Sequence, residues 1–133
     1  VGGGGERQTL RIAATLADGC NLPSTVDLDR KLAVFRAHAV AAGRDPAELR
    51  ITVLDVPIVG ADPDAVARLV ERHRGRSKAT VYAAAHHAGT PDAHVARYTR
   101  LAEAGVDTVF VSLPDLSGPA EIEQFAPVIS AFG

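Results

Sequence analysis

Two nearly continuous apolar runs constrain the fold of this chain more than any other feature of its sequence. They occupy residues 51–59 and 106–113, and apolar side chains stand at both alternating sets of positions along them. A strand of this kind has both faces covered, which is typical of a parallel sheet flanked by helices. Pro57 cannot donate a backbone hydrogen bond, so we expect regular pairing to weaken there. A shorter strand is expected at residues 20–22, closed by Pro23.

Amphipathic stretches separate these strands and predict helices, the first over about residues 6–16. The second helix has Ser24 or Thr25 as its expected N-cap, with Asp27 in the position of a capping box. This helix ends at Gly43, because glycine readily adopts the left-handed conformation that closes a helix. Its apolar residues form one stripe at helical spacing: Leu28, Leu32, Phe35, Ala39 and Ala42.

Proline at the first helical position marks the start of three later helices, at Pro63, Pro91 and Pro119. Pro127 lies inside the last pattern and should kink that helix or split it in two. The helix from Pro91 is expected to turn one face inward: Val95, Tyr98, Leu101 and Ala102.

The stretch over residues 72–89 is the least regular part of the chain. Its basic run, residues 72–78, is followed by an alanine-rich segment. We expect a solvated loop and a short surface helix here, because charge runs are usually hydrated. The alternative is that this run forms a basic patch that binds the acidic tail of a ligand.

Strands alternating with helices predict βαβ units and a parallel sheet with right-handed crossovers, which makes this an α/β chain. Its 133 residues are sufficient for one domain, residues 1–133, with a substantial core. Hydrophobic residues make up 47% and charged residues 23%, the balance of an ordinary soluble protein. The net charge of −2 offers no electrostatic case for binding nucleic acid or an anionic membrane, and no apolar run is long enough to span a bilayer.

The single cysteine, Cys20, has no internal disulfide partner, and nothing at the start of the chain resembles a signal peptide. Both observations favour a cytoplasmic protein, with Cys20 as a buried and inert thiol. The chain opens at Val1, within what looks like the end of a strand, which suggests a fragment or a frame that starts at a valine codon.

Four consecutive glycines, residues 2–5, lead into the first helix. Glycine has no Cβ and accepts positive φ, so such a loop can bring its N–H groups close to a ligand. The start of the helix has unpaired N–H groups and favours negative charge. A phosphate could therefore bind here, with Arg7 as a charged donor and Thr9 as a neutral one. A flexible tag or a plain turn is the alternative, because terminal polyglycine is often only a linker.

Several segments together carry a family resemblance. The opening stretch, residues 1–11, is followed by Ala-Asp-Gly-Cys-Asn at residues 17–21 and by Ala-Gly-Arg-Asp-Pro at residues 42–46. Gly-Thr-Pro at residues 89–91 and Glu-Ala-Gly-Val-Asp at residues 103–107 complete the ordered set. This set resembles the luciferase-like monooxygenase family, especially its oxidoreductases that depend on the deazaflavin coenzyme F420, and it covers nearly the whole chain.

The resemblance implies the C-terminal portion of a TIM (β/α)8 barrel, with about three parallel strands, covering helices and the end of a fourth strand at Val1. It also implies that the glycine loop holds the phosphate of F420 or, alternatively, of FMN. The residues implied are Gly3, Gly4 and Gly5 through their N–H groups, with Arg7 and Thr9 as side-chain contacts.

In that family the flavin-ring pocket and the catalytic histidine or acid lie in the N-terminal half of the barrel. No catalytic residue is therefore assigned to this chain, and whether it is an enzyme by itself stays open. The implied reaction class is two-electron transfer between the reduced cofactor and a small organic substrate. The alternative is a non-catalytic half-barrel that self-associates as a homo-oligomer, since a partial barrel leaves open sheet edges and an exposed inner face.

Other polar residues are weaker candidates. His86, His87 and His94 have no completing acidic or thiolate ligands, so we expect no metal site. Four further side chains follow or end the strands, where barrel active sites gather, and are second-rank pocket candidates: Asn21, Asp55, Ser112 and Asp115.

Overall fold

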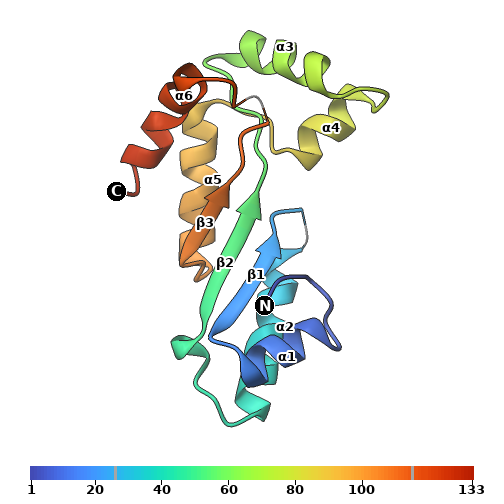
Figure 1. Cartoon of the computed structure of the whole chain (residues 1–133), viewed down its shortest axis with the longest axis vertical. Coiled ribbons are helices and arrows are strands. Elements are labelled where there is room, and N and C mark those ends of the chain that lie inside the picture. The colour runs from blue at the N-terminus through green and yellow to red at the C-terminus, as the bar shows by residue number, and fades with distance from the viewer. Residues whose placement is uncertain (26, 115) are drawn as a thin grey trace. The chain divides into compact units, whose positions relative to one another are not determined.

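The structure is a computed structural model that describes residues 1–25, 27–114 and 116–133 (Figure 1). Its elements, in chain order, are α1 (Thr9–Leu16), β1 (Gly19–Pro23), α2 (Leu28–Ala41), the short 3-10 helix η1 (Pro46–Glu48), β2 (Arg50–Asp55), α3 (Pro63–His73), α4 (Ala79–Ala85), α5 (Pro91–Glu103), β3 (Thr108–Val111) and α6 (Pro119–Ser130). The chain divides into two compact units. The first comprises Val1–Asp55 and Leu101–Phe110, and the second Val56–Arg100 and Val111–Gly133.

The first unit contains the sheet, whose strands lie in the order β1-β2-β3 and point the same way (Figure 1). β1 and β2 are parallel, with Gly19 opposite Arg50 and Pro23 opposite Leu54. On the other side of β1, the first residues of the chain add a further parallel segment. There the N–H of Asn21 donates to the carbonyl oxygen of Val1 (2.8 Å), and Gly2 bridges to Asn21.

Parallel strands whose spatial order follows the chain order are the arrangement of a (β/α)8 barrel. The structure therefore confirms the predicted partial barrel, including the end of a fourth strand at the start of the chain. None of the described helices is long and apolar enough to cross a membrane.

Helices α1 and α2 cover one face of this sheet and form its hydrophobic core. The strand residues that point toward them alternate as the pleat requires: Cys20 and Leu22 on β1, and Ile51 and Val53 on β2. From the helices come Leu10, Ala13, Ala14, Leu32, Phe35 and Ala39. Leu32, Phe35 and Ala39 are buried and Leu28 packs against them, so most of the stripe predicted on the second helix faces the core. Ala42 was wrongly included, because it is the exposed C-cap of α2.

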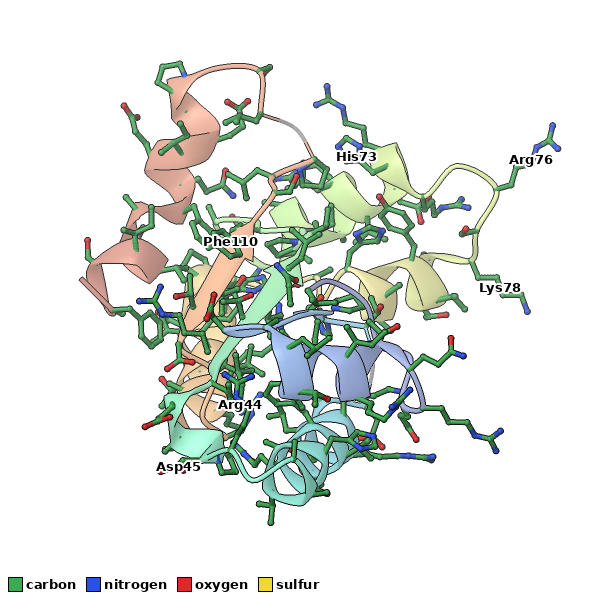
Figure 2. All side chains as sticks on the ribbon, turned by 60° about the horizontal axis from the view of Figure 1, so that its bottom comes forward. Arg44, Asp45, His73, Arg76, Lys78 and Phe110 are labelled. Carbon is green, nitrogen blue, oxygen red and sulfur yellow. The ribbon has the colours of Figure 1, made fainter. Side chains whose placement is uncertain are left out.

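Arg44 closes the C-terminal end of α1. Its Nη1 atom donates to the carbonyl oxygens of Ala14 (3.0 Å) and Ala17 (2.6 Å), which have no partner further along the helix (Figure 2 labels Arg44). Asp45, the next residue, caps η1 through its side chain, which accepts from the N–H of Ala47 (2.9 Å).

The second unit is built from the segment after β2 and helices α3, α4, α6 and most of α5. The N–H of Ile58 donates to the carbonyl oxygen of His86, and that of Gly60 to Gly89. Tyr98 meets Phe125 and Phe132 edge to face, with ring centroids 6.4 Å apart in each pair. In the loop between α3 and α4, Arg76 and Lys78 extend into solvent (Figure 2), as expected for this basic run.

Several predicted boundaries differ from the structure. The first helix begins at Thr9 rather than near Glu6, because the preceding residues form the loop described below. The N-cap of α2 is Asp27, whose side chain accepts from the N–H of Arg30, so the prediction of Ser24 or Thr25 was wrong. The strand predicted over residues 51–59 stops at Asp55, two residues before Pro57.

Two predictions for the later helices were also incomplete. The last helix is not split, because α6 continues through Pro127 as one helix. On α5, Tyr98 is buried as expected, but Ala102 is exposed and His94 takes an inward position that the apolar pattern did not include.

Candidate functional site

The glycine loop begins where the first segment of the chain leaves the sheet, on the carboxyl side of its pairing with β1. Gly3 has φ of +116°, a conformation that favours glycine, and its N–H donates to the carbonyl oxygen of Asn21 (3.0 Å). The chain then turns away and enters α1 at Thr9. Active sites of (β/α)8 barrels are built from loops at this end of the strands.

Backbone donors gather in the loop. Of the hydrogen bonds between described residues, none uses the N–H groups of Gly4, Gly5 or Glu6. The N–H of Leu10, in the first turn of α1, donates back to the carbonyl oxygen of Gly5 in the loop (2.9 Å), and the N-cap, Gln8, provides no side-chain cap. Unpaired N–H groups at a helix start are ready donors for an anion. Among the predicted glycines, Gly4 and Gly5 have their N–H groups available, whereas that of Gly3 is already used.

Thr9 lies against the glycines. A Cβ added to Gly5 would lie 3.0 Å from Oγ1 of Thr9, and one added to Gly3 would lie 3.3 Å from its Cγ2. The absence of side chains at both positions therefore makes room for the half-buried threonine. Arg7 stands at the outer edge of the loop, where it is exposed and its carbonyl oxygen accepts from Nε of Arg11 (3.4 Å).

Three residues of α2 hold the loop in place. The carboxylate of Glu6 pairs with Nζ of Lys31 at 2.8 Å and with Nη2 of Arg30 at 3.0 Å. The ring nitrogen Nε2 of His38 donates to the carbonyl oxygen of Glu6 (2.9 Å). The hydrogen bonds from Lys31 and then Arg30 lower the pKa of the Glu6 carboxyl below its usual value. We call Glu6 and these three residues of α2 the loop clamp.

The loop clamp also determines the electrostatics of the loop. Because two cations pair with Glu6, its negative charge does not oppose an anion at the neighbouring N–H groups. The sequence analysis missed the clamp: only the adjacent basic pair Arg30-Lys31 in the second helix could have indicated it.

The second-rank candidates do not form a common site in the described structure. Asn21 is half-buried in β1, and both of its backbone groups are used by the first segment of the chain. Asp55 is completely buried at the end of β2, and Ser112 is exposed just after β3. Asp115 lies outside the described residues.

The histidines have structural contacts. Nδ1 of His86 donates to the carbonyl oxygen of Val56 (2.9 Å), and its ring lies 4.2 Å from that of Tyr82. His94 is buried, and its Nε2 lies 3.3 Å from the carbonyl oxygen of Ile58. Within the described ranges, no three histidine, cysteine, aspartate or glutamate side chains are placed to hold a metal ion. Cys20 is buried, and burial raises the pKa of its thiol.

The second unit contains a pocket of about 150 Å³. Its polar lining residues are Arg72, Glu121 and Gln124. Nε2 of Gln124 donates to the carbonyl oxygen of Val59 (2.7 Å), so this amide is used to join α6 to the pocket wall. The remaining lining residues are Pro57, Ile58, Val59, Leu69, Leu113 and Pro114.

The sheet, its strand order and the covering helices define part of a (β/α)8 barrel, and solved structures with this fold resemble the chain. One is an F420-dependent secondary alcohol dehydrogenase, solved with an F420–acetone adduct, which is 20% identical to this chain with a TM-score of 0.72. The structural match covers 98% of this chain and 47% of that chain. EDTA monooxygenase from Chelativorans sp. BNC1 is 19% identical, with a TM-score of 0.74 and coverages of 99% and 44%.

A third similar structure is the coenzyme F420 dependent tetrahydromethanopterin reductase from Methanopyrus kandleri, 18% identical, with a TM-score of 0.65 and coverages of 96% and 47%. The chain thus spans less than half the length of each of these proteins. No family model and no curated protein matches the sequence. At 18–20% identity, the similarity to these structures shows that the chain shares their fold.

Proposed function

We propose that this chain is the C-terminal portion of an F420- or FMN-dependent oxidoreductase of the luciferase-like monooxygenase family, and that it contributes the loop that binds the cofactor phosphate. The main support is the glycine loop at the carboxyl side of a parallel sheet: it leads into α1, and no hydrogen bond between described residues uses the N–H groups of Gly4 and Gly5. Two of the three similar structures described above are F420-dependent by their names, and the third is a monooxygenase.

The phosphate would be held by four groups of the loop. Gly4 and Gly5 offer N–H donors that no hydrogen bond between described residues uses, and Arg7 adds a cation at the loop edge. Thr9 offers a hydroxyl at the first position of α1, where the helix dipole also favours negative charge. Gly3 shapes the loop through its positive φ and its bond to β1 rather than as a donor.

When bound, the cofactor supplies the hydride chemistry, and the protein binds and orients it. The residues described here bind and orient the phosphate end, and no group of this chain is assigned to the reacting centre. A complete barrel has eight strands. The strands that this chain lacks would add the flavin-ring pocket and the site for a small organic substrate. We therefore expect the chain alone to bind cofactor weakly and to have little or no turnover.

Titration of the 133-residue chain with FMN and with F420, followed by cofactor fluorescence, tests this proposal. Arg7→Ala should weaken binding about tenfold, because a hydrogen bond to a charged group contributes about 1.5 kcal/mol. Arg76→Ala is the matched control, since Arg76 is also an exposed arginine and lies in the loop between α3 and α4. Failure of both cofactors to bind at high micromolar concentration would contradict the proposal, as would equal losses in the two variants.

A further inference from the structure

The pocket of the second unit has a buried apolar end and an open end. Pro57 and Ile58, which line it, are buried, and Ile58 is only 3% exposed. Arg72 and Pro114 also line it, and both are exposed. The other apolar lining residues are half-buried: Val59, Leu69 and Leu113. A molecule that enters from the exposed side therefore meets Arg72 first and apolar side chains further in.

The walls of the pocket are held in place by hydrogen bonds within the second unit. The N–H of Ile58 donates to the carbonyl oxygen of His86 (3.0 Å), and the carbonyl oxygen of Ile58 accepts from the N–H of Gly89 (3.0 Å). On the side of α6, Nε2 of Gln124 donates to the carbonyl oxygen of Val59 (2.7 Å). The pocket is thus bounded by groups that are already fixed, as small-molecule sites usually are.

The two charged side chains that line the pocket differ in what they offer a ligand. Glu121 accepts from the hydroxyl of Ser117 through Oε1 (2.9 Å) and from the N–H of Gly118 through Oε2 (3.0 Å). Both carboxylate oxygens are therefore used at the start of α6, where the helix dipole also stabilises negative charge. Arg72 is the cation of the described lining, and a guanidinium has enough N–H donors to bind more than one partner at once. The pocket is therefore suited to a ligand whose charged group is negative.

The surroundings of Arg72 also favour an anion. Five of the chain's 14 lysine and arginine residues lie within residues 68–78, together with one acidic residue, Glu71, which pairs with Arg74 (2.7 Å). We call residues 68–78 the basic cluster. Such a concentration of positive charge, on a chain whose net charge is −2, attracts anions to this end of α3. Within the basic cluster, Arg72 lies on the same face of α3 as Leu69, three residues before it, and both line the pocket.

The volume of the pocket limits the ligand to a small molecule, because a cavity of about 150 Å³ holds a single benzene ring. We propose that the pocket binds a small organic carboxylate, with its apolar body in the buried end and its carboxylate paired with the guanidinium of Arg72. This site belongs to the second unit, so it goes beyond the phosphate loop proposed for the cofactor and does not depend on it.

Titration of the 133-residue chain with sodium benzoate, followed by NMR of its methyl groups, tests the site. We expect a dissociation constant of about 1 mM, the range of a small ligand held by one ion pair and a few apolar contacts. The methyl signals that should shift are those of the lining residues Ile58, Val59, Leu69 and Leu113. The signals of Ile12 and Val40, which are exposed on α1 and α2 of the first unit, should not shift.

Arg72→Gln should raise the dissociation constant of benzoate about tenfold, because a hydrogen-bonded charge pair is lost. Arg68→Gln is the matched control: Arg68 is also exposed, one turn earlier on α3, and does not line the pocket. Benzyl alcohol is the neutral probe, and its affinity should change less than about twofold in Arg72→Gln. Leu69→Phe, which narrows the pocket, should weaken the binding of both probes. Circular dichroism verifies that each variant is folded, and Arg72→Gln replaces an exposed side chain, so it tests the proposal even where Leu69→Phe does not fold.

Absence of shifts at the lining residues up to about 10 mM benzoate would overturn the proposal. Equal losses of affinity in Arg72→Gln and Arg68→Gln would also overturn it, since they would mean non-specific attraction to the basic cluster. So would benzyl alcohol binding as tightly as benzoate, or displacement of benzoate by FMN, which would make the pocket part of the cofactor site. Binding of benzoate without binding of FMN or F420 would instead support this site and contradict the proposed function, so the two failures are distinguishable.

Discussion

Glu6 and Lys31 form an ion pair at 2.8 Å that joins the glycine loop to α2. Their side chains are only 25% and 18% exposed, so the pair is better shielded from solvent than an ordinary surface contact. The same carboxylate also binds Arg30. The loop that we propose as a phosphate site is thus held from the helix that packs beside α1.

Breaking this connection should loosen the loop without unfolding the protein. In Glu6→Gln the charge that pairs with both cations is lost, and we expect faster amide exchange at Gly3 and Leu10, whose hydrogen-bonded N–H groups stand at the two ends of the loop. Glu71→Gln is the control, since Glu71 forms an exposed pair with Arg74 (2.7 Å) within one helix turn. Unchanged exchange in the loop of Glu6→Gln would show that the bond from His38 suffices to hold it.

The ion pairs should make stability depend on pH in a known direction. The pKa of Glu6 is lower in the folded chain than in the unfolded chain, so the stability that its ion pairs contribute is fully present above the unfolded pKa. That contribution is lost as the pH falls through the folded pKa. The difference in free energy of unfolding between the wild type and Glu6→Gln should therefore be constant near neutral pH and shrink on acidification below about 4.5. A difference that grows on acidification would contradict the assigned shift.

Gly19 should not tolerate a side chain. A Cβ at this position would collide with the carbonyl oxygen of Arg50, because β1 and β2 approach closely where they begin to pair. We expect Gly19→Ala to lower the free energy of unfolding by about 2 kcal/mol, as forced overpacking does, measured by urea denaturation. At Gly2 an added Cβ meets nothing within 4 Å, so Gly2→Ala should change stability by less than about 0.5 kcal/mol. Equal losses of unfolding free energy in Gly19→Ala and Gly2→Ala would show that the contact between β1 and β2 can adjust to the added Cβ.

The thiol of Cys20 should be inert in the folded protein. It is 3% exposed in the core between β1 and the helices, and burial raises its pKa. Because the thiolate is the reactive form, a colorimetric thiol reagent at neutral pH should react slowly with the native chain and rapidly in urea. Rapid reaction without denaturant would mean that this part of the core opens readily.

Local patterns in the sequence determined much of the architecture. Pro63, Pro91 and Pro119 begin their helices as predicted, and Pro57 comes just after β2 ends. The alternation of strands and helices predicted a parallel sheet, and the strand order confirms a partial barrel. These features depend on backbone preferences and hydrophobic periodicity, which act over a few residues and can be read directly from the chain.

The tertiary structure alone decided how the loop is held and where His94 lies. Glu6 and its cations are 24 and 25 residues apart in sequence, and they meet because α1 and α2 pack together. His94 is buried because its ring reaches the carbonyl oxygen of Ile58, a partner 36 residues away. Long-range pairing of this kind depends on the packed arrangement of whole elements, so a periodic pattern in one segment carries no information about it.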